Sequence, residues 1–286
     1  MNKKVGIGIV TCNREKFLHK LLSTLKPCLE NKQQNYINEW VIVNDGEPQQ
    51  KPSEALWATW INNPENLGVA KSKNKILKFL LDKQCDYIFV LEDDVEVLDC
   101  SIFKRYIEAH EISGIHHFNY GPGSPFNRIQ KDVPNFDLHN RHLLNQESEP
   151  NPKMVIQYSP NCEVALYEHT VAMFSFFTSK AIEAAGFFPE VYNNCWEHVD
   201  HTYQIIKANL HPPFWWFADI ADSHKLLKVS DTAIKESTIA KDNQEWMKNV
   251  LSGREIYKSR HGHYPNQPPY ISKEQVIKAI KNLKPE

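Results

Sequence analysis

Apolar runs alternate with helical repeats over the first hundred residues, and this alternation constrains the fold more than any other feature. The runs Val5–Val10, Trp40–Val43 and Tyr87–Leu91 are typical of buried strands. Apolar residues at helical spacing predict helices over Lys16–Leu25 and Val69–Leu81. Repeated β-α units of this kind form a mainly parallel sheet with helices on its faces. The sequence therefore predicts an α/β fold.

The second half of the chain is less regular. Residues 114–161 are rich in Gly, Pro, Asn and His, and a long irregular insertion in a compact domain is more often functional than accidental. The elements predicted beyond it are a strand region over 163–177, helices over 180–185 and 197–208, a strand over 214–217, and a polar, mostly helical stretch from Lys228 onward.

Three consecutive carboxylates, Glu92-Asp93-Asp94, directly follow the predicted strand at Tyr87–Leu91. Acidic groups at such a position are costly unless a cation or hydrogen bonds neutralise them, and Mg²⁺ and Mn²⁺ prefer oxygen ligands. In parallel sheets, ligands bind beyond the carboxyl ends of the strands, where Asp45 also lies. A solvated acidic turn would give the same letters, so this motif alone leaves a metal site and a solvated turn equally open.

A second cluster, Cys195–His201, places carboxylates and imidazoles next to an aromatic ring. If it opens a helix, Glu197, Asp200 and His201 share one face. Acidic residues also stabilise the start of a helix, which is a purely structural interpretation. Carboxylate and imidazole beside Trp196 would equally form a general base next to a platform for a sugar ring.

The charge balance argues against two classes of partner. The chain has 33 Lys+Arg against 35 Asp+Glu, without a basic excess for nucleic acid or a basic block for a membrane surface. No run approaches the ~20 apolar residues of a membrane-spanning helix, and the first residues do not form a secretory signal. We therefore predict a cytoplasmic protein without an integral membrane segment, and peripheral association stays open.

The six cysteines are scattered and form no Cys-x-x-Cys pair. This spacing predicts free, mostly buried thiols, and neither a disulfide framework nor a zinc site. The cysteines are Cys12, Cys28, Cys85, Cys100, Cys162 and Cys195.

Five segments, taken in order, resemble motifs of the GT-A glycosyltransferases, especially the inverting family 2 type with its rhamnosyl-, glucosyl- and N-acetylhexosaminyltransferases of bacterial polysaccharides. They are Thr11-Cys12-Asn13-Arg14, Asn44-Asp45-Gly46-Glu47, Asn66 to Asn74, Leu91-Glu92-Asp93-Asp94, and Gly186-Phe187-Phe188 through Trp196-Glu197-His198-Val199-Asp200 with His224. Each motif is weak alone, but five in order over residues 5–225 form a strong joint signal. The resemblance implies a Rossmann-like GT-A fold with a mixed, mostly parallel central sheet flanked by helices.

The resemblance also implies a role for each matching residue. Nucleotide-sugar contacts would come from Thr11, Asn13, Arg14, Asp45, Lys71, Lys73, Asn74, Glu92 and Asp93. Asp94 would bind a Mn²⁺ or Mg²⁺ ion that bridges the two phosphates, and His224 would be a further metal or phosphate contact. The ion would neutralise the charge on the departing nucleoside diphosphate. Trp196 would line the acceptor site together with the insertion at 114–161.

One position departs from the family pattern. The family usually has Glu-Asp where this chain has Glu197-His198, and its second residue is commonly the base that deprotonates the acceptor hydroxyl. Imidazole has a reference pKa near ~6.5, which suits proton abstraction at neutral pH. Glu197 and His198 are equally good candidates for this base, with Asp200 behind them. The departure also leaves open a non-catalytic module that binds a sugar or nucleotide.

The implied function is metal-dependent, inverting transfer of a sugar, from a UDP-sugar by preference, to a hydroxyl of a glycan or glycolipid in polysaccharide, capsule or lipopolysaccharide biosynthesis. Residues 1–228 would form the GT-A domain, with the nucleotide-sugar half in 1–100 and the acceptor half in 101–228. Residues 229–286 would form a helical extension, either a lid over the donor or a packing element. A nucleotidyltransferase that makes nucleotide sugars ranks lower, because Thr11-Cys12-Asn13-Arg14 lacks the glycine cluster of a phosphate-binding loop.

Overall fold

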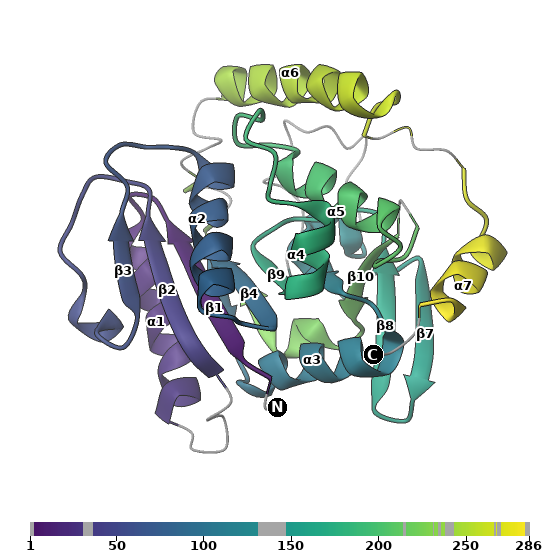
Figure 1. Ribbon diagram of the computed structural model, residues 1–286, viewed down its shortest axis with the longest axis horizontal. Helices are drawn as coiled ribbons and strands as arrows, with labels where there is room; N and C mark the ends of the chain where they lie inside the picture. The colour runs from purple at the N-terminus through teal and green to yellow at the C-terminus, as the bar shows by residue number, and fades with distance from the viewer. Residues whose placement is uncertain are drawn as a thin grey trace.

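The computed structural model (Figure 1) describes residues 3–30, 37–130, 147–213, 216–230, 232–233, 236–237, 243–265, 267 and 270–283. Its centre is a six-stranded sheet in the order β3-β2-β1-β4-β9-β6. The strands are β1 Val5–Thr11, β2 Ile37–Asn44, β3 Thr59–Asn62, β4 Tyr87–Glu92, β6 His117–Asn119 and β9 Phe174–Thr178. The first four are parallel, and β9 runs antiparallel to both β4 and β6. This sheet confirms the predicted α/β architecture, mixed and mostly parallel.

Helices cover both faces of this sheet (Figure 1). The helices that cover it are α1 Glu15–Glu30, α2 Val69–Asp82, α3 Ser101–Ser113, α4 Ser179–Ala185 and α5 Glu197–Lys207, and α6 Asn243–His261 and α7 Lys273–Lys281 follow near the C-terminus. Apolar residues of α1 and α3 share a core with one face of the sheet, and those of α2, α4 and α5 share a second core with the other face. Successive strand residues alternate between the two cores, as Phe89 and Val90 do in β4. The continuous apolar runs of the sequence therefore reflect strands that are buried on both faces.

Gly6 and Gly8 in β1 allow α2 to approach the sheet closely. A Cβ atom at Gly8 would lie 2.0 Å from Cγ2 of Ile76, and one at Gly6 would lie 2.7 Å from Cδ2 of Leu80. Side chains at these two positions would push α2 outward, together with the candidate site residues that it carries.

Two smaller sheets accompany the central one. One contains β7 Met154–Ser159, β8 Cys162–Tyr167 and β10 Phe217–Ile220, and the other pairs β5 Val95–Val97 with β11 Leu227–Val229. The predicted strand over 214–217 begins only at Phe217, and residues 214–215 lie outside the described residues. Neither α3 nor the β5–β11 pair is predicted from the sequence.

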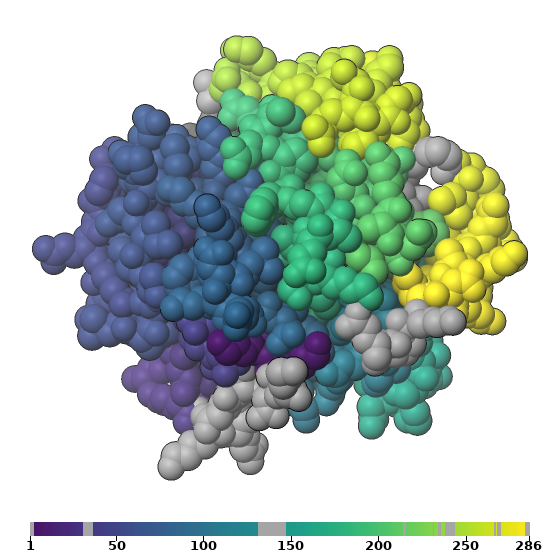
Figure 2. Space-filling model, in the orientation of Figure 1, coloured from purple at the N-terminus to yellow at the C-terminus, as the bar shows by residue number. Residues whose placement is uncertain are grey.

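The two C-terminal helices pack against the rest of the chain. Val276 and Ile280 of α7 are buried in the same core as α1 and α3. Helix α6 lies across the segment that leads into α5, as the yellow-green and green surfaces of Figure 2 show, and its Tyr257 is fully buried there. Among the described residues, no helix combines the length and the apolar character needed to cross a bilayer. The division of the chain after residue 228 stays a prediction.

Cys28 and Cys100 form a disulfide, so the prediction of free thiols is wrong for these two residues. Cys28 lies in α1, and Cys100 directly precedes α3. Both helices pack on the same face of the sheet, which brings the two Cα atoms to 5.2 Å across a sequence separation of 72. Such a long-range contact leaves no local pattern in the sequence. The other four cysteines are free, as predicted.

Reduction of this disulfide is expected to lower the free energy of unfolding by about 4 kcal/mol, because it closes a long loop in the unfolded chain. Urea unfolding with and without a reductant measures the change. The control is a Cys28→Ala/Cys100→Ala variant, whose unfolding should not respond to the reductant. An unchanged midpoint for the reduced wild-type protein would contradict a stabilising disulfide.

Burial holds two histidines, His117 and His211, in the neutral form. His211 Nδ1 lies 2.9 Å from the carbonyl oxygen of Pro212, to which it donates, so Nε2 is left to accept from Ala218 N at 3.3 Å. Burial lowers the pKa of His211 to about 4. Burial also holds the pKa of His117 well below its usual value, with a smaller contribution from neighbouring His211. Both rings are therefore uncharged in the folded protein near neutral pH.

Acid is expected to destabilise the protein through these rings. The folded pKa of His211, about 4, lies below the unfolded value near ~6.5, so the unfolded chain binds the proton first as the pH falls. The stability that this ring contributes is complete above pH ~6.5 and is lost toward pH ~4, with a loss of about 2 kcal/mol at pH ~5. Urea unfolding across this range measures the loss. The pH dependence should shrink in His211→Gln and persist in His19→Gln, where the side chain is exposed; identical curves for all three proteins would refute the assignment.

Candidate active site

The carboxyl ends of β1, β2 and β4 bring predicted site residues into contact. Thr11 ends β1, and its buried hydroxyl donates to Asp93 Oδ2 at 2.8 Å. Its carbonyl oxygen accepts from Asp45 N, beyond the end of β2, also at 2.8 Å. At the same edge, Asn13 Oδ1 accepts from Glu47 N at 2.7 Å. The parallel pairing of β1 with both neighbours places these ends together, at the edge where such sheets bind ligands.

Asp45 holds the loop that leads into α2. Its carboxylate accepts from Leu67 N at 2.8 Å, Gly68 N at 3.0 Å and Asn63 Nδ2 at 2.6 Å. Gly68 has a φ of 87°, a left-handed backbone that favours glycine. Asn63 is fully buried and is absent from the predicted site. Asn63 directly follows β3, as Asp45 directly follows β2, so a strand predicted at Thr59–Asn62 would have been the signal that identified it.

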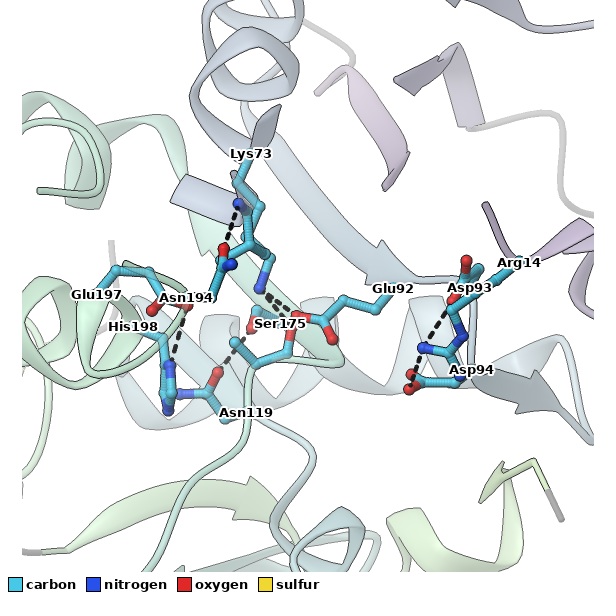
Figure 3. Close-up of polar contacts among 12 residues, drawn as sticks. Arg14, Lys73, Glu92, Asp93, Asp94, Asn119, Ser175, Asn194, Glu197 and His198 are labelled. Atoms are coloured by element: carbon cyan, nitrogen blue, oxygen red, sulfur yellow. Dashed lines mark hydrogen bonds and ion pairs between the residues drawn. The ribbon is translucent and has the colours of Figure 1, made fainter. Parts of the chain in front are cut away.

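Arg14 bridges the two aspartates of the acidic motif (Figure 3). Its Nη1 atom lies 3.2 Å from Asp93 Oδ1 and 3.1 Å from Asp94 Oδ2. Burial raises the pKa of Asp93 to about 7, although Arg14 opposes the shift. Burial and the neighbouring Glu92 also raise the pKa of Asp94. A further positive charge at these carboxylates would therefore favour their ionised forms.

The acidic motif fits a hard cation, although Arg14 holds the position between its carboxylates. Asp94 Oδ1 is buried without a hydrogen-bond partner, so one carboxylate oxygen is available as a ligand. Mg²⁺ commonly takes one or two carboxylates and completes its shell with substrate phosphates and water. Within the described residues, no group of three or more His, Cys, Asp and Glu side chains could hold a metal ion. The phosphates of a substrate would therefore have to complete a metal shell built on Asp93 and Asp94.

His224 lies on the 3₁₀ turn η6 Ser223–Lys225, where its charged neighbours include Lys225 and Glu149. The following strand β11 pairs with β5 so that Ser230 comes beside Asp94, with Ser230 N donating to Asp94 O at 2.8 Å. None of the described contacts joins His224 to Asp94, and a metal or phosphate contact by His224 stays a prediction.

Lys73 of α2 is a buried cation at the centre of the site (Figure 3). Its ammonium lies 2.5 Å from Glu92 Oε1 and donates to Ala172 O at 3.2 Å. Its charge also contributes to lowering the pKa of Glu197 on α5. Lys73 therefore links the acidic motif at the end of β4 electrostatically to the residues at the start of α5.

The other two predicted residues of α2 lie outside this centre. Lys71 is exposed. The Asn74 amide donates to Phe188 O and accepts from Phe188 N, both at 2.9 Å, and also donates to Glu190 Oε1. Asn74 thus fixes α2 to the loop that follows α4. A contact between either residue and a nucleotide sugar stays a prediction.

Glu197 and His198 begin α5 and form a pair (Figure 3). His198 Nδ1 lies 3.2 Å from Glu197 Oε1, and Glu197 Oε2 is buried without a hydrogen-bond partner. Burial acts to raise the pKa of Glu197, but His198 and Lys73 outweigh it and hold the pKa below its usual value. The His198 side chain is 20% exposed, against 4% for Glu197. An acceptor can therefore reach His198 more readily than Glu197.

The loop before α5 has an unusual backbone. Asn194 has a φ of 58° and Trp196 a φ of 71°. Asparagine tolerates this left-handed region, but a bulky residue such as Trp196 adopts it at a cost of roughly 1–3 kcal/mol. Asn194 Oδ1 accepts from Val69 N at 3.2 Å and joins the loop to the start of α2. Trp196 Nε1 donates to Val250 O of α6 at 3.0 Å, so one edge of the indole faces that helix. The acceptor role of Trp196 stays a prediction.

Asp200, the third candidate base, is fully buried and faces α6. Its Oδ2 atom accepts from Tyr192 Oη at 2.6 Å and Arg260 Nε at 2.7 Å, and it lies 2.9 Å from His261 Nε2. Burial acts to raise the pKa of Asp200, but hydrogen bonds from Arg260 and Tyr192 outweigh it and lower the pKa. Its oxygens are thus already engaged, which favours an anchoring role over that of a base.

Comparisons with known proteins agree with this architecture. The fold is similar to that of the mannosyltransferase PcManGT from Pyrobaculum calidifontis, at a TM-score of 0.53 and 12% identity over 99% of this chain and 70% of that chain. An uncharacterized glycosyltransferase of Acanthamoeba polyphaga mimivirus is 26% identical over 262 residues, which cover 88% of this chain and 91% of the relative. The chain therefore has a GT-A-like fold. No family model matches it.

The chain also resembles TarS of S. aureus, at a TM-score of 0.45 and 13% identity, and it spans 55% of that structure's chain. The likeness to PcManGT identifies the fold alone. The donor, the acceptor and the metal have to be argued from the site.

Proposed function

We propose that the protein is a glycosyltransferase that moves a sugar from a nucleoside-diphosphate sugar to a hydroxyl group of a glycan or glycolipid, with a divalent cation and with inversion. The arrangement that carries the proposal places Asp93-Asp94 at the end of β4 and Glu197-His198 at the start of α5, on either side of the Lys73–Glu92 pair (Figure 3). Single displacement needs a stabilised leaving group on one side and a base on the other. The structure of the similar mannosyltransferase is a complex with GDP-Man and Mn²⁺, which supports this class of donor and cofactor.

The donor would lie against the ends of β1, β2 and β4. Thr11, Asn13 and Asp45 would contact the nucleoside, with uridine favoured. Arg14 has two buried guanidinium nitrogens, Nε and Nη2, without hydrogen-bond partners, and they suit diphosphate oxygens. Asp94, assisted by Asp93, would hold Mn²⁺ or Mg²⁺. The bound ion would supply positive charge that stabilises the departing nucleoside diphosphate.

We assign the base to His198, with Glu197 as the alternative. Glu197 Oε1 engages Nδ1 of the imidazole, which orients the ring and leaves Nε2 for the acceptor hydroxyl. His198 would take the hydroxyl proton as the oxygen attacks the anomeric carbon. The greater exposure of His198 supports this choice. Glu197 is the alternative because its Oε2 atom has no hydrogen-bond partner and could accept the proton.

A donor-hydrolysis screen tests the proposal. The full chain is incubated with a panel of UDP- and GDP-sugars, in Mn²⁺ or a chelator, with and without simple glycosides as acceptors, and free nucleoside diphosphate is measured. Release that depends on the metal and on one donor is the expected result. Donor binding without turnover with any acceptor would instead favour a non-catalytic binding module. Neither release nor metal-dependent nucleotide binding would overturn the proposal.

A further inference from the structure

We infer that α6 is a fixed support for the first turn of α5, and that Arg260 is a positioning residue for the Glu197–His198 pair. The role of that pair rests on the proposed function. The support that α6 gives to the first turn of α5 does not depend on the proposed function, and it can be measured separately.

The first contact between α6 and α5 involves Asp200, on the C-terminal side of the Glu197–His198 pair. Asp200 N donates to Trp196 O at 2.9 Å and closes the turn that contains Glu197 and His198. Arg260 of α6 binds the Asp200 carboxylate with two nitrogens, Nε to Oδ2 at 2.7 Å and Nη2 to Oδ1 at 3.3 Å. Such a two-pronged contact fixes direction as well as distance. Because Asp200 is fully buried, its charge depends on these partners.

The second contact involves Trp196, on the N-terminal side of the Glu197–His198 pair. Trp196 precedes Glu197 and has the left-handed backbone described above. The Trp196 indole donates to Val250 O of α6, and a Cβ atom added at Gly253 would lie 2.7 Å from Trp196 Cδ1. Gly253 therefore gives the indole room to lie against α6, and this packing helps to hold an unfavourable conformation. Helix α6 thus contacts the residues on both sides of the pair.

Three basic residues near the end of α6 make contacts within the chain. Arg260 and His261 both contact Asp200. The ammonium of Lys258 lies 4.4 Å from the centre of the Tyr264 ring, just beyond the end of the helix. Arg260 and His261 hold α5, and Lys258 contacts the segment that follows α6. In this arrangement they are not placed to cover a donor diphosphate, which favours a packing element over a lid.

Two variants test the inference from opposite sides of the pair. Arg260→Gln removes the ionic contact with Asp200, and Arg260→Lys restores its charge alone. Gly253→Ala pushes on Trp196 without leaving an unpaired charge, so it serves if Arg260→Gln does not fold. The matched controls, Lys248→Gln and Ser252→Ala, change exposed residues of the same helix.

Two measurements are made on each variant: steady-state transfer with the donor and acceptor found by the screen, and hydrogen exchange of the α5 amides. We expect Arg260→Gln and Gly253→Ala to lower kcat about a hundredfold, because displacements near 1 Å have effects of this size, with the donor KM nearly unchanged. Exchange in the first turn of α5 should become faster, Arg260→Lys should recover part of kcat, and the controls should match wild type.

Three results would overturn the inference: a raised donor KM at unchanged kcat, which would indicate a lid; a lower unfolding midpoint with unchanged kcat; or unchanged exchange in α5. If the wild-type protein transfers no sugar from any donor, the proposed function fails. The exchange data would still decide whether α6 supports the turn.

Discussion

Replacing Asp94 with asparagine is expected to lower sugar transfer at least about a hundredfold, because the loss of a metal-binding charge removes several kcal/mol of transition-state stabilisation. Asparagine keeps nearly the same shape and an oxygen that can accept from Arg14 Nη1, which lies 3.1 Å from Asp94 Oδ2 in the native chain. The effect should therefore come from the missing charge. Transfer rates and Mn²⁺-dependent nucleotide binding, measured over a range of metal concentrations, report it.

Asp82→Asn is the control, since Asp82 is an exposed carboxylate at the far end of α2. It should leave both rate and metal dependence unchanged. If Asp94→Asn retained near wild-type transfer and the same response to metal, Asp94 would not be the ligand, and a metal site at the end of β4 would have to be abandoned.

Replacing His198 with glutamine is expected to lower kcat between about 10²- and 10⁴-fold, the usual contribution of a general base. Glutamine can still accept a hydrogen bond but cannot take the hydroxyl proton. Glu197→Gln should have a smaller effect, because an amide oxygen can still accept from the imidazole N–H and orient the ring. Both variants should bind the donor with nearly native affinity, because their side chains would serve the acceptor side.

The variant that loses more kcat, His198→Gln or Glu197→Gln, identifies the base. If Glu197 were the base, Glu197→Gln would be the more damaging change. Equal and small losses in both variants, with donor hydrolysis intact, would place the base elsewhere. Glu183→Gln, an exposed change on α4, controls for general effects of removing a carboxylate.

The donor half of the site could be predicted because its residues directly follow strands that are buried on both faces. The continuous apolar runs predicted β2 and β4, and the polar residues after them, Asp45 and Glu92-Asp93-Asp94, had to lie at the same edge of the sheet. Their approximate location followed from topology. Their partners did not, since the contact of Arg14 with both aspartates depends on side-chain geometry.

The other features of the fold and the site could not be predicted, because they depend on contacts between residues far apart in the sequence. The contact between Arg260 and Asp200 joins residues 60 positions apart, and the disulfide spans 72, so no local spacing indicates either. The contact with Arg260 also explains why Asp200, one of the three candidate bases, faces α6. A cytoplasmic location stays a prediction, and the disulfide is a feature more usual in oxidising compartments.

The disulfide also changes what a protease can accomplish. The stretch between Cys28 and Cys100 contains β2, β3, α2 and β4, which carry most of the donor edge. A single backbone cut within that stretch would leave two fragments joined through sulfur, and β1 would still bridge β2 and β4 through its hydrogen bonds. Nicked molecules should therefore keep full mass on a non-reducing gel and separate only when thiol is added.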